Sequence, residues 1–203
     1  MLTLMSFSFA LASPTANDLE KYISNGDDIS YIEKANEWGK NAVLDINDGI
    51  TIYRTILYNG KTKKELFEIL KDWSKDNLNG ENKIICHNEN DFTVIYNRLL
   101  IEDIARYSKK NKTYSIALRP YVLLSIKDGY IRIKVEIDNY YVQNLNKIDD
   151  ETKYTKKMNI NKGYPFKLKK DNMEATSKAF VLSYIIADYL KDSIIDKIIE
   201  TEI

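Results

Sequence analysis

Apolar side chains recur at helical spacing between residues 62 and 77, in the stretch "TKKELFEILKDWSKDN". They fall at i, i+3, i+4 and i+7 on one helix face: Leu66, Ile69, Leu70 and Trp73. Thr62, followed three residues later by Glu65, matches the capping box that begins many helices. Most of the other positions are Lys, Glu or Asp, which suit a face in contact with water. The pattern predicts a helix over 62–77 that lies on a sheet through its apolar face.

A second pattern alternates apolar and polar residues in two runs, 121–127 and 130–138, which Asp128-Gly129 separates. An Asp-Gly pair between such runs is typical of a two-residue type I′ hairpin, which places Lys127 opposite Tyr130. This register gathers one apolar face: Val122, Leu124, Ile126, Ile131, Ile133 and Val135. The opposite face carries mostly polar and aromatic side chains: Tyr121, Lys127, Tyr130, Arg132, Lys134 and Glu136. We expect an antiparallel sheet that is covered on one side only.

The rest of the chain adds further elements. Ser30 and Glu33 repeat the capping pattern, which predicts a short helix at 30–39. Runs of β-branched and aromatic residues predict three more strands, at 50–58, 83–87 and 92–101, and extend the first strand of the hairpin to 114–127. A long helix is expected at 173–199. Residues 139–171 show no periodicity and are predicted to form a mobile insertion.

The expected order is therefore strand, helix, four strands, helix, with the long helices on one face of an antiparallel sheet. This is an α+β fold of a single domain, 50–203, which a linker with one short helix precedes at 13–49.

The stretch from Ile50 to about Ile137 also resembles an uncharacterised domain-of-unknown-function family of exported bacterial proteins with a TBP-like domain. The likeness is carried by "NGKTKKELFEILKDW", "KIICHNENDFTVIY" and the hairpin "KDGYIRIKVEI". The resemblance implies a TBP-like sheet with the order β-α-β-β-β-β-α. The family has no established activity, so the resemblance implies no catalytic residues.

The N-terminus carries an apolar stretch, "LTLMSFSFALA", that is too short to span a bilayer of about 30 Å as a helix. It ends in Ala10-Leu11-Ala12, the small-x-small pattern that signal peptidase cleaves. We therefore expect residues 1–12 to be a signal peptide and the mature, periplasmic or secreted protein to begin at Ser13.

Charge and residue counts exclude several classes of function. Thirty Lys and Arg balance thirty Asp and Glu, which argues against a nucleic-acid-binding protein, because neutralising phosphates usually takes a basic excess. No apolar run has the length of a transmembrane helix. Cys86 and His87 are the single cysteine and histidine, and as strand neighbours their side chains point to opposite faces. We expect no metal site and no cofactor, since the ligand spacings and glycine motifs that such sites need are missing.

The one-sided sheet and the lack of a recognised catalytic pattern favour a non-catalytic binding module. Its candidate ligand surface is the polar sheet face: Tyr121, Lys127, Tyr130, Arg132, Lys134 and Glu136. Interleaved aromatic and charged groups suit a glycan, a peptide or a protein partner. The alternative is a hydrolase that acts on glycans in the periplasm, with two carboxylates ~5–10 Å apart in a cleft. A third hypothesis is an apolar ligand held between the sheet and the C-terminal helix.

Overall fold

The computed structural model describes Leu19 and residues 30–77, 83–85, 93–146, 154 and 156–202. The predicted signal peptide, 1–12, lies outside these residues, as do Cys86 and His87. The described part consists of helices and two antiparallel sheets, so the predicted α+β fold is confirmed.

The first sheet contains five strands in the order β1-β7-β6-β3-β2. The strands are β1 (Ile50–Leu57), β2 (Lys83–Ile85), β3 (Thr93–Arg98), β6 (Tyr121–Lys127) and β7 (Tyr130–Ile137). The β6–β7 hairpin has the predicted register, with Lys127 opposite Tyr130 and Tyr121 opposite Glu136. All six side chains of its predicted apolar face are buried.

The turn of this hairpin is not the predicted type I′, because that type needs a positive φ at both central residues. Gly129 has a φ of 65°, whereas Asp128 is not in the left-handed region. Contacts with the start of the predicted helix hold the turn: the Lys63 N–H donates to Asp128 Oδ1, and the Gly129 N–H donates to the Lys61 carbonyl. The strand register is therefore kept by a different turn, supported from outside the hairpin.

The second sheet is missing from the predicted element order. Its four strands are arranged β4-β5-β8-β9, with β4 (Ile101–Lys109), β5 (Lys112–Leu118), β8 (Asn139–Asn144) and β9 (Lys156–Asn159). The predicted strands 92–101 and 114–127 are wrong in extent, because each run divides between the two sheets. The chain leaves the first sheet after β3 and returns to it at β6. At the crossover the Leu99 N–H donates to the Pro120 carbonyl, 3.0 Å away, and Pro120 itself has no N–H for a ladder.

The segment 139–171 is not the structureless insertion expected from its composition. Its described residues include β8, β9 and two short 3₁₀ helices, η3 (Ile160–Lys162) and η4 (Lys170–Asn172). Tyr140 is fully buried in the main core, and Ile160 joins it there. Burial of these apolar side chains fixes a segment whose surface positions are highly charged.

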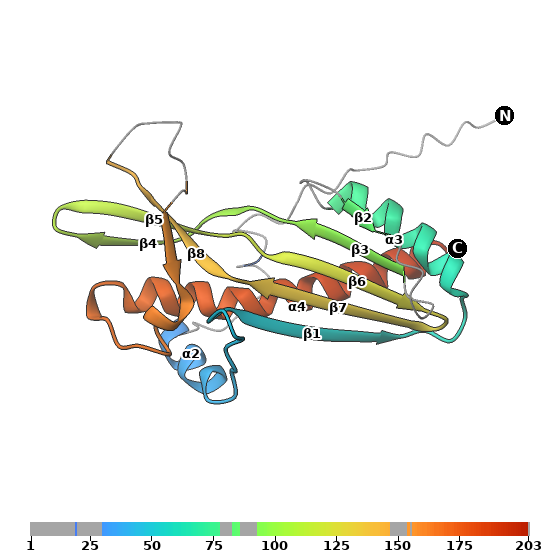
Figure 1. Ribbon diagram of the computed structural model, residues 1–203, viewed down its shortest axis with the longest axis horizontal. Helices are drawn as coiled ribbons and strands as arrows, with labels where there is room; N and C mark the ends of the chain where they lie inside the picture. The colour runs from blue at the N-terminus through green and yellow to red at the C-terminus, as the bar shows by residue number, and fades with distance from the viewer. Residues whose placement is uncertain are drawn as a thin grey trace.

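The α-helices with described bounds are α2 (Tyr31–Gly39), α3 (Lys63–Asn77) and α4 (Met173–Glu200), and of these α3 and α4 pack on the sheets. The long helix α4 runs past strands of both sheets (Figure 1) and contacts β1, β4, β5 and β7. Helix α3 contacts β3, β6 and α4. Its predicted capping box is present, since the Thr62 N–H donates to Glu65 Oε2 at 2.8 Å.

Helix α2, predicted as part of a linker, packs against α4. Ala35 is fully buried in the same core as the sheets, and so is Leu19. Trp38 meets Tyr184 of α4 edge to face, with ring centroids 5.6 Å apart. Gly39 lies so close to Pro165 that a Cβ on it would come within 2.4 Å of the proline ring. The described residues before β1 therefore belong to the packed unit.

Within the described ranges, α4 included, we find no helix that combines the length and apolar character needed to cross a bilayer.

Candidate functional site

The six residues predicted to form a ligand surface lie on one face of the first sheet, opposite the apolar face that packs on the helices. They do not form one compact site. Tyr121 and Glu136 are paired at one end of the hairpin, and Lys127 and Tyr130 are paired at the other. These ends are about 20 Å apart at ~3.3 Å per strand residue. Arg132 and Lys134 lie between them on β7.

Strand β1 extends this face with an aromatic group. Tyr53 stands beside Lys134 in the β1–β7 ladder and is 48% exposed. The Arg132 guanidinium lies over the Tyr53 ring, 4.6 Å from its centroid. The Lys134 ammonium is bonded to Glu136 Oε1 at 2.5 Å. The middle of the sheet face is thus a stacked arginine beside an ion pair.

A cluster of tyrosines and arginines lies where the two sheets meet. The Arg98 guanidinium is 4.6 Å from the centroid of the Tyr121 ring, and its Nη2 donates to the Tyr141 hydroxyl at 2.9 Å. Arg119 lies over the Tyr141 ring at 4.6 Å, and Lys157 lies over it at 5.8 Å. We call these five residues the junction cluster. Only Tyr121 of this cluster was among the predicted site residues.

Tyr141 is the centre of the junction cluster. Its side chain is almost fully buried, and burial raises the pKa of its phenol, with the nearby Asp138 carboxylate adding to the effect. The neutral hydroxyl accepts from Arg98 and lies 3.3 Å from Asp138 Oδ2. The π face of this ring attracts the three cations around it, Arg98, Arg119 and Lys157.

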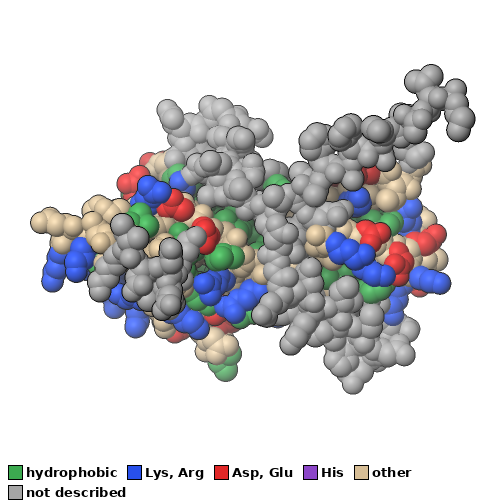
Figure 2. Space-filling model, turned by 90° about the horizontal axis from the view of Figure 1, so that it is seen from above, with side chains coloured by type: hydrophobic (Ala, Val, Ile, Leu, Met, Phe, Trp, Pro, Cys, Tyr) green, Lys and Arg blue, Asp and Glu red, His purple; other side chains and the backbone are tan. Residues whose placement is uncertain are grey.

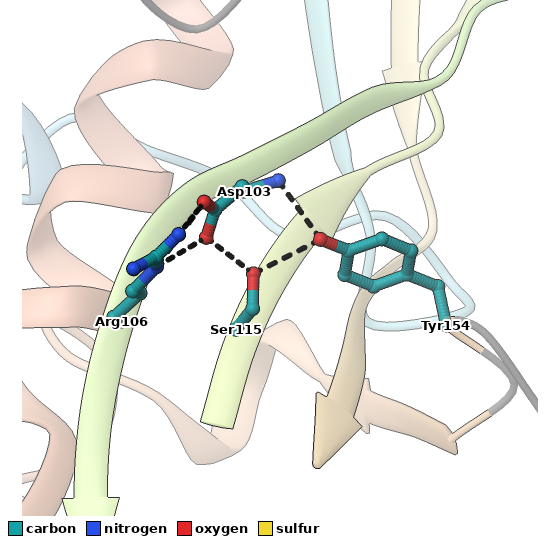
Figure 3. A network of polar contacts seen from close by, with 4 residues as sticks. All are labelled: Asp103, Arg106, Ser115 and Tyr154. Atoms are coloured by element: carbon teal, nitrogen blue, oxygen red, sulfur yellow. Dashed lines mark hydrogen bonds and ion pairs between the residues drawn. The ribbon is translucent and has the colours of Figure 1, made fainter. Parts of the chain in front are cut away.

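A polar network lies beside this cluster on the second sheet. Ala117, Tyr141 and Tyr154 form a small apolar group of their own, and Tyr154 carries the network onward. Its hydroxyl accepts from the Asp103 N–H at 3.0 Å and is 3.0 Å from Ser115 Oγ. Ser115 in turn donates to Asp103 Oδ1 at 2.7 Å (Figure 3).

Asp103 is held in an uncommon conformation, with a φ of 52° in a β-bulge of β4. Arg106 Nε donates to both of its carboxylate oxygens, at 2.8 and 3.1 Å. This guanidinium, helped by the Ser115 hydroxyl, holds the pKa of the Asp103 carboxyl below its usual range. Ser115 is fully buried and its Oγ already has two partners, so it is not placed as a nucleophile.

Sequence patterns could not have revealed most of this arrangement. Arg98 and Arg119 flank the crossover between the sheets, outside any regular alternation. Tyr141 and Tyr154 fall in the segment that shows no periodicity. The signal that existed was the pair of tyrosines in "NYYVQN", a strand-like composition within polar surroundings.

The electrostatics of the combined surface are basic. The sheet face and the junction cluster together hold six cationic side chains: Arg98, Arg119, Lys127, Arg132, Lys134 and Lys157. Glu136 pairs with Lys134, and Asp138 accepts from the Tyr141 hydroxyl. In the part of the chain that the structure describes, no group of three or more His, Cys, Asp and Glu side chains is placed to hold a metal ion. The surface offers donors and aromatic faces to an acidic ligand.

No protein-family model and no curated protein matches the sequence. Similar solved structures include a DUF4468 family protein from Bacteroides ovatus ATCC 8483, which is 12% identical. The match covers 85% of this chain and 95% of that chain, with a TM-score of 0.49. A TBP-like protein from Parabacteroides distasonis ATCC 8503 is 10% identical over 77% of this chain and 96% of its own, with a TM-score of 0.47.

Proposed function

We propose that this chain is a non-catalytic, exported binding module that holds an acidic segment of a partner peptide or protein. The ligand lies across the polar face of the first sheet and the junction cluster. The observation that carries this proposal is the stacking of guanidinium groups on tyrosines, Arg132 on Tyr53 and Arg98 on Tyr121, on the face opposite the helices.

Stacking of this kind suits recognition of carboxylates. A guanidinium that lies flat on an aromatic ring is held in one orientation. The N–H groups at its edge point outward, where two of them can donate to the two oxygens of a carboxylate. Tyrosine and arginine are also the residue types that carry much of the binding energy in protein interfaces. The excess of cations over carboxylates on this surface supports an acidic partner over a neutral one.

The alternative, a glycan hydrolase with a carboxylate pair, has less support. A cavity of about 680 Å³ beside the second sheet has one carboxylate among its lining residues, Asp171, which is bonded to Lys109 at 3.2 Å. A smaller hollow at the β6–β7 turn has Glu65 and Asp128, and both accept hydrogen bonds that fix the start of α3. The larger cavity thus lacks a second carboxylate among its described lining residues, and in the smaller hollow both carboxylates hold the start of α3.

An array of acidic, neutral and basic peptides, with a glycan array beside it, tests the proposal. We expect hits among acidic peptides, and we expect Tyr130→Ala combined with Arg132→Ala to weaken them. Lys64→Gln on the outer face of α3 is the control, since Lys64 is exposed and lies off the sheet face. If the double variant binds every hit as well as the wild type, the sheet-face site is wrong. Hits confined to glycans would replace the peptide partner with a carbohydrate.

Export is tested separately by mass spectrometry of the protein from its native cells. We expect the N-terminal peptide to begin at Ser13. A cytoplasmic product that retains Met1 would contradict this part of the proposal.

A further inference from the structure

A second charged feature lies away from the sheet face, at the end of the molecule formed by the β4–β5 hairpin. It is the cavity of about 680 Å³ introduced above, bounded by the ends of β4 and β5, by β9 and by the turns around η3 and η4. Eight lysines line it: Lys109, Lys110, Lys112, Lys156, Lys157, Lys162, Lys169 and Lys170. Figure 2 shows basic side chains gathered at this end of the molecule.

This concentration of charge is local, because the whole chain carries equal numbers of basic and acidic residues. Asp171 is the one carboxylate among the lining residues, and it neutralises Lys109 alone. Like charges held around one cavity repel each other and create a strongly positive potential inside it. We call this cavity the lysine pocket.

Packed aromatic and apolar side chains form the wall of the lysine pocket. Tyr107 and Tyr114 are cross-strand neighbours on β4 and β5, and their rings stack with centroids 5.1 Å apart. Both line the pocket together with Val142 and Met158. A firm aromatic and apolar wall therefore carries a rim of ammonium groups.

One buried polar side chain in this wall has an oxygen without a hydrogen-bond partner among the described residues. Asn172 is 9% exposed and lines the pocket, and its Oδ1 accepts no hydrogen bond from the described residues. Its Nδ2 donates only to the weak acceptor Met158 Sδ, 3.7 Å away. The Nδ2 group is the part of this amide that can donate to an anion, since its present acceptor is a weak one.

Asn172 also precedes the first residue of α4, and its side chain does not cap that helix. The 28-residue helix begins directly after three lining residues of η4, which are Lys170, Asp171 and Asn172. The dipole of this helix favours negative charge at its N-terminal end. The helix dipole, the Nδ2 donor of Asn172 and the lysines favour the same kind of ligand.

The tip of the β4–β5 hairpin gives a further indication. Lys110 and Asn111 both have positive φ, at 50° and 57°, as a type I′ turn requires. Asn is common in this conformation, but a lysine there is under strain that an Asn or Gly would relieve. Lys110 therefore places a positive charge at a position where the backbone conformation alone would favour Asn or Gly.

We propose that the lysine pocket binds a compact, multiply charged anion whose charge is carried by phosphate groups. A phosphate presents up to two charges and three acceptor oxygens in a small volume, which matches many ammonium groups around one cavity. Lysine is a common phosphate ligand because its ammonium acts as a point charge. The phosphates come either from a soluble polyphosphorylated molecule or from the headgroups of an anionic phospholipid surface. The pocket shares Lys157 with the junction cluster but none of the six predicted residues of the sheet face, and it does not depend on the function proposed there.

Calorimetric titration of the full chain with sodium tripolyphosphate tests the proposal at low salt and at about 0.15 M salt, where exposed charges are screened beyond ~8 Å. The test variant is Lys156→Gln with Lys169→Gln. The matched control is Lys40→Gln with Lys64→Gln, which changes the net charge equally at exposed lysines that do not line the pocket. We expect about tenfold weaker binding for the test variant, wild-type binding for the control, and weaker binding at the higher salt concentration.

Sedimentation with vesicles distinguishes the two sources of phosphate. Binding to phosphatidylglycerol vesicles but not to phosphatidylcholine vesicles, with the same loss in the test variant, would identify lipid headgroups. Tripolyphosphate binding without vesicle binding would identify a soluble ligand. The proposal is overturned if neither probe binds, or if the test and control variants weaken binding equally, since that result would reflect net charge alone.

Discussion

The indole nitrogen of Trp73 on α3 donates a hydrogen bond to Ser193 Oγ on α4, with 2.9 Å between the two atoms. Trp73 is 1% exposed and ends the apolar stripe that begins with Leu66. The predicted role of this helix, to bury its stripe against the sheet, is confirmed. The hydrogen bond adds a second role, because it joins α3 to α4 at a fixed position.

We expect Trp73→Ala to lower the free energy of unfolding by ~3–5 kcal/mol, because it removes a large buried side chain and leaves a cavity. Ser193→Ala, which removes only the hydrogen-bond acceptor, should cost about 1 kcal/mol. Urea denaturation measures both values. A loss below about 1 kcal/mol for Trp73→Ala would contradict its place in the core.

A bidentate ion pair joins β1 to α4. Arg54 Nε donates to Asp188 Oδ1 at 2.5 Å, and Nη2 donates to Oδ2 at 3.1 Å. The two side chains are 27% and 40% exposed, so solvent screens the pair in part. A double-mutant cycle with Arg54→Gln and Asp188→Asn should give a coupling energy of about 1 kcal/mol. The coupling should fall as salt is added, and a value near zero at low salt would show that the pair does not stabilise the fold.

Gly129 is expected to resist substitution. Its φ is 65°, and a Cβ placed on it would lie 3.0 Å from the Tyr58 carbonyl oxygen. Gly129→Ala should therefore cost ~1–2 kcal/mol in chemical denaturation. Gly60→Ala is a suitable comparison, because its φ is not in the left-handed region and the nearest atoms belong to a tyrosine side chain. Equal effects of the two substitutions would argue against backbone strain at Gly129.

The network around Asp103 predicts a dependence of stability on acid. The pKa of this carboxyl is lower in the folded protein than in the unfolded chain, chiefly because of Arg106. Between the folded and unfolded pKa values of Asp103, the unfolded chain binds more protons than the folded protein. The stability that Asp103 contributes is therefore fully present above about pH 4 and is lost as the pH falls through the folded pKa. Asp103→Asn should flatten this acid limb of the unfolding free energy, and asparagine also tolerates the positive φ. Urea titrations at a series of acidic pH values would contradict the prediction if both proteins lost stability in parallel.

Local patterns in the sequence were sufficient for the hairpin and the helices. Alternation in 121–127 and 130–137 predicted which side chains are buried and which share the polar face, because a strand places successive residues on opposite sides. The register survived an incorrect turn type, since the facing residues follow from the two-residue loop length. That the polar face binds a ligand stays a prediction.

The second sheet could not be predicted from the same patterns. Its hairpin turns at Lys110 and Asn111, where no glycine signals a positive φ. The crossover at Leu99 and Pro120 lies inside two long apolar runs that look continuous in sequence. The lysine pocket is likewise assembled from residues as far apart as Tyr107 and Asn172, so only the fold brings them together.

The chain enters the two sheets alternately, with β1 to β3 in the first, β4 and β5 in the second, β6 and β7 in the first again, and β8 and β9 in the second. No single cut in the gene separates one sheet from the other. Recombination can exchange whole domains between relatives when a boundary in the sequence separates one domain from the next. The alternation of the two sheets along the chain leaves no such boundary between them. The sheet face and the lysine pocket are therefore inherited together, and each can diverge only by substitutions in a scaffold that the other shares.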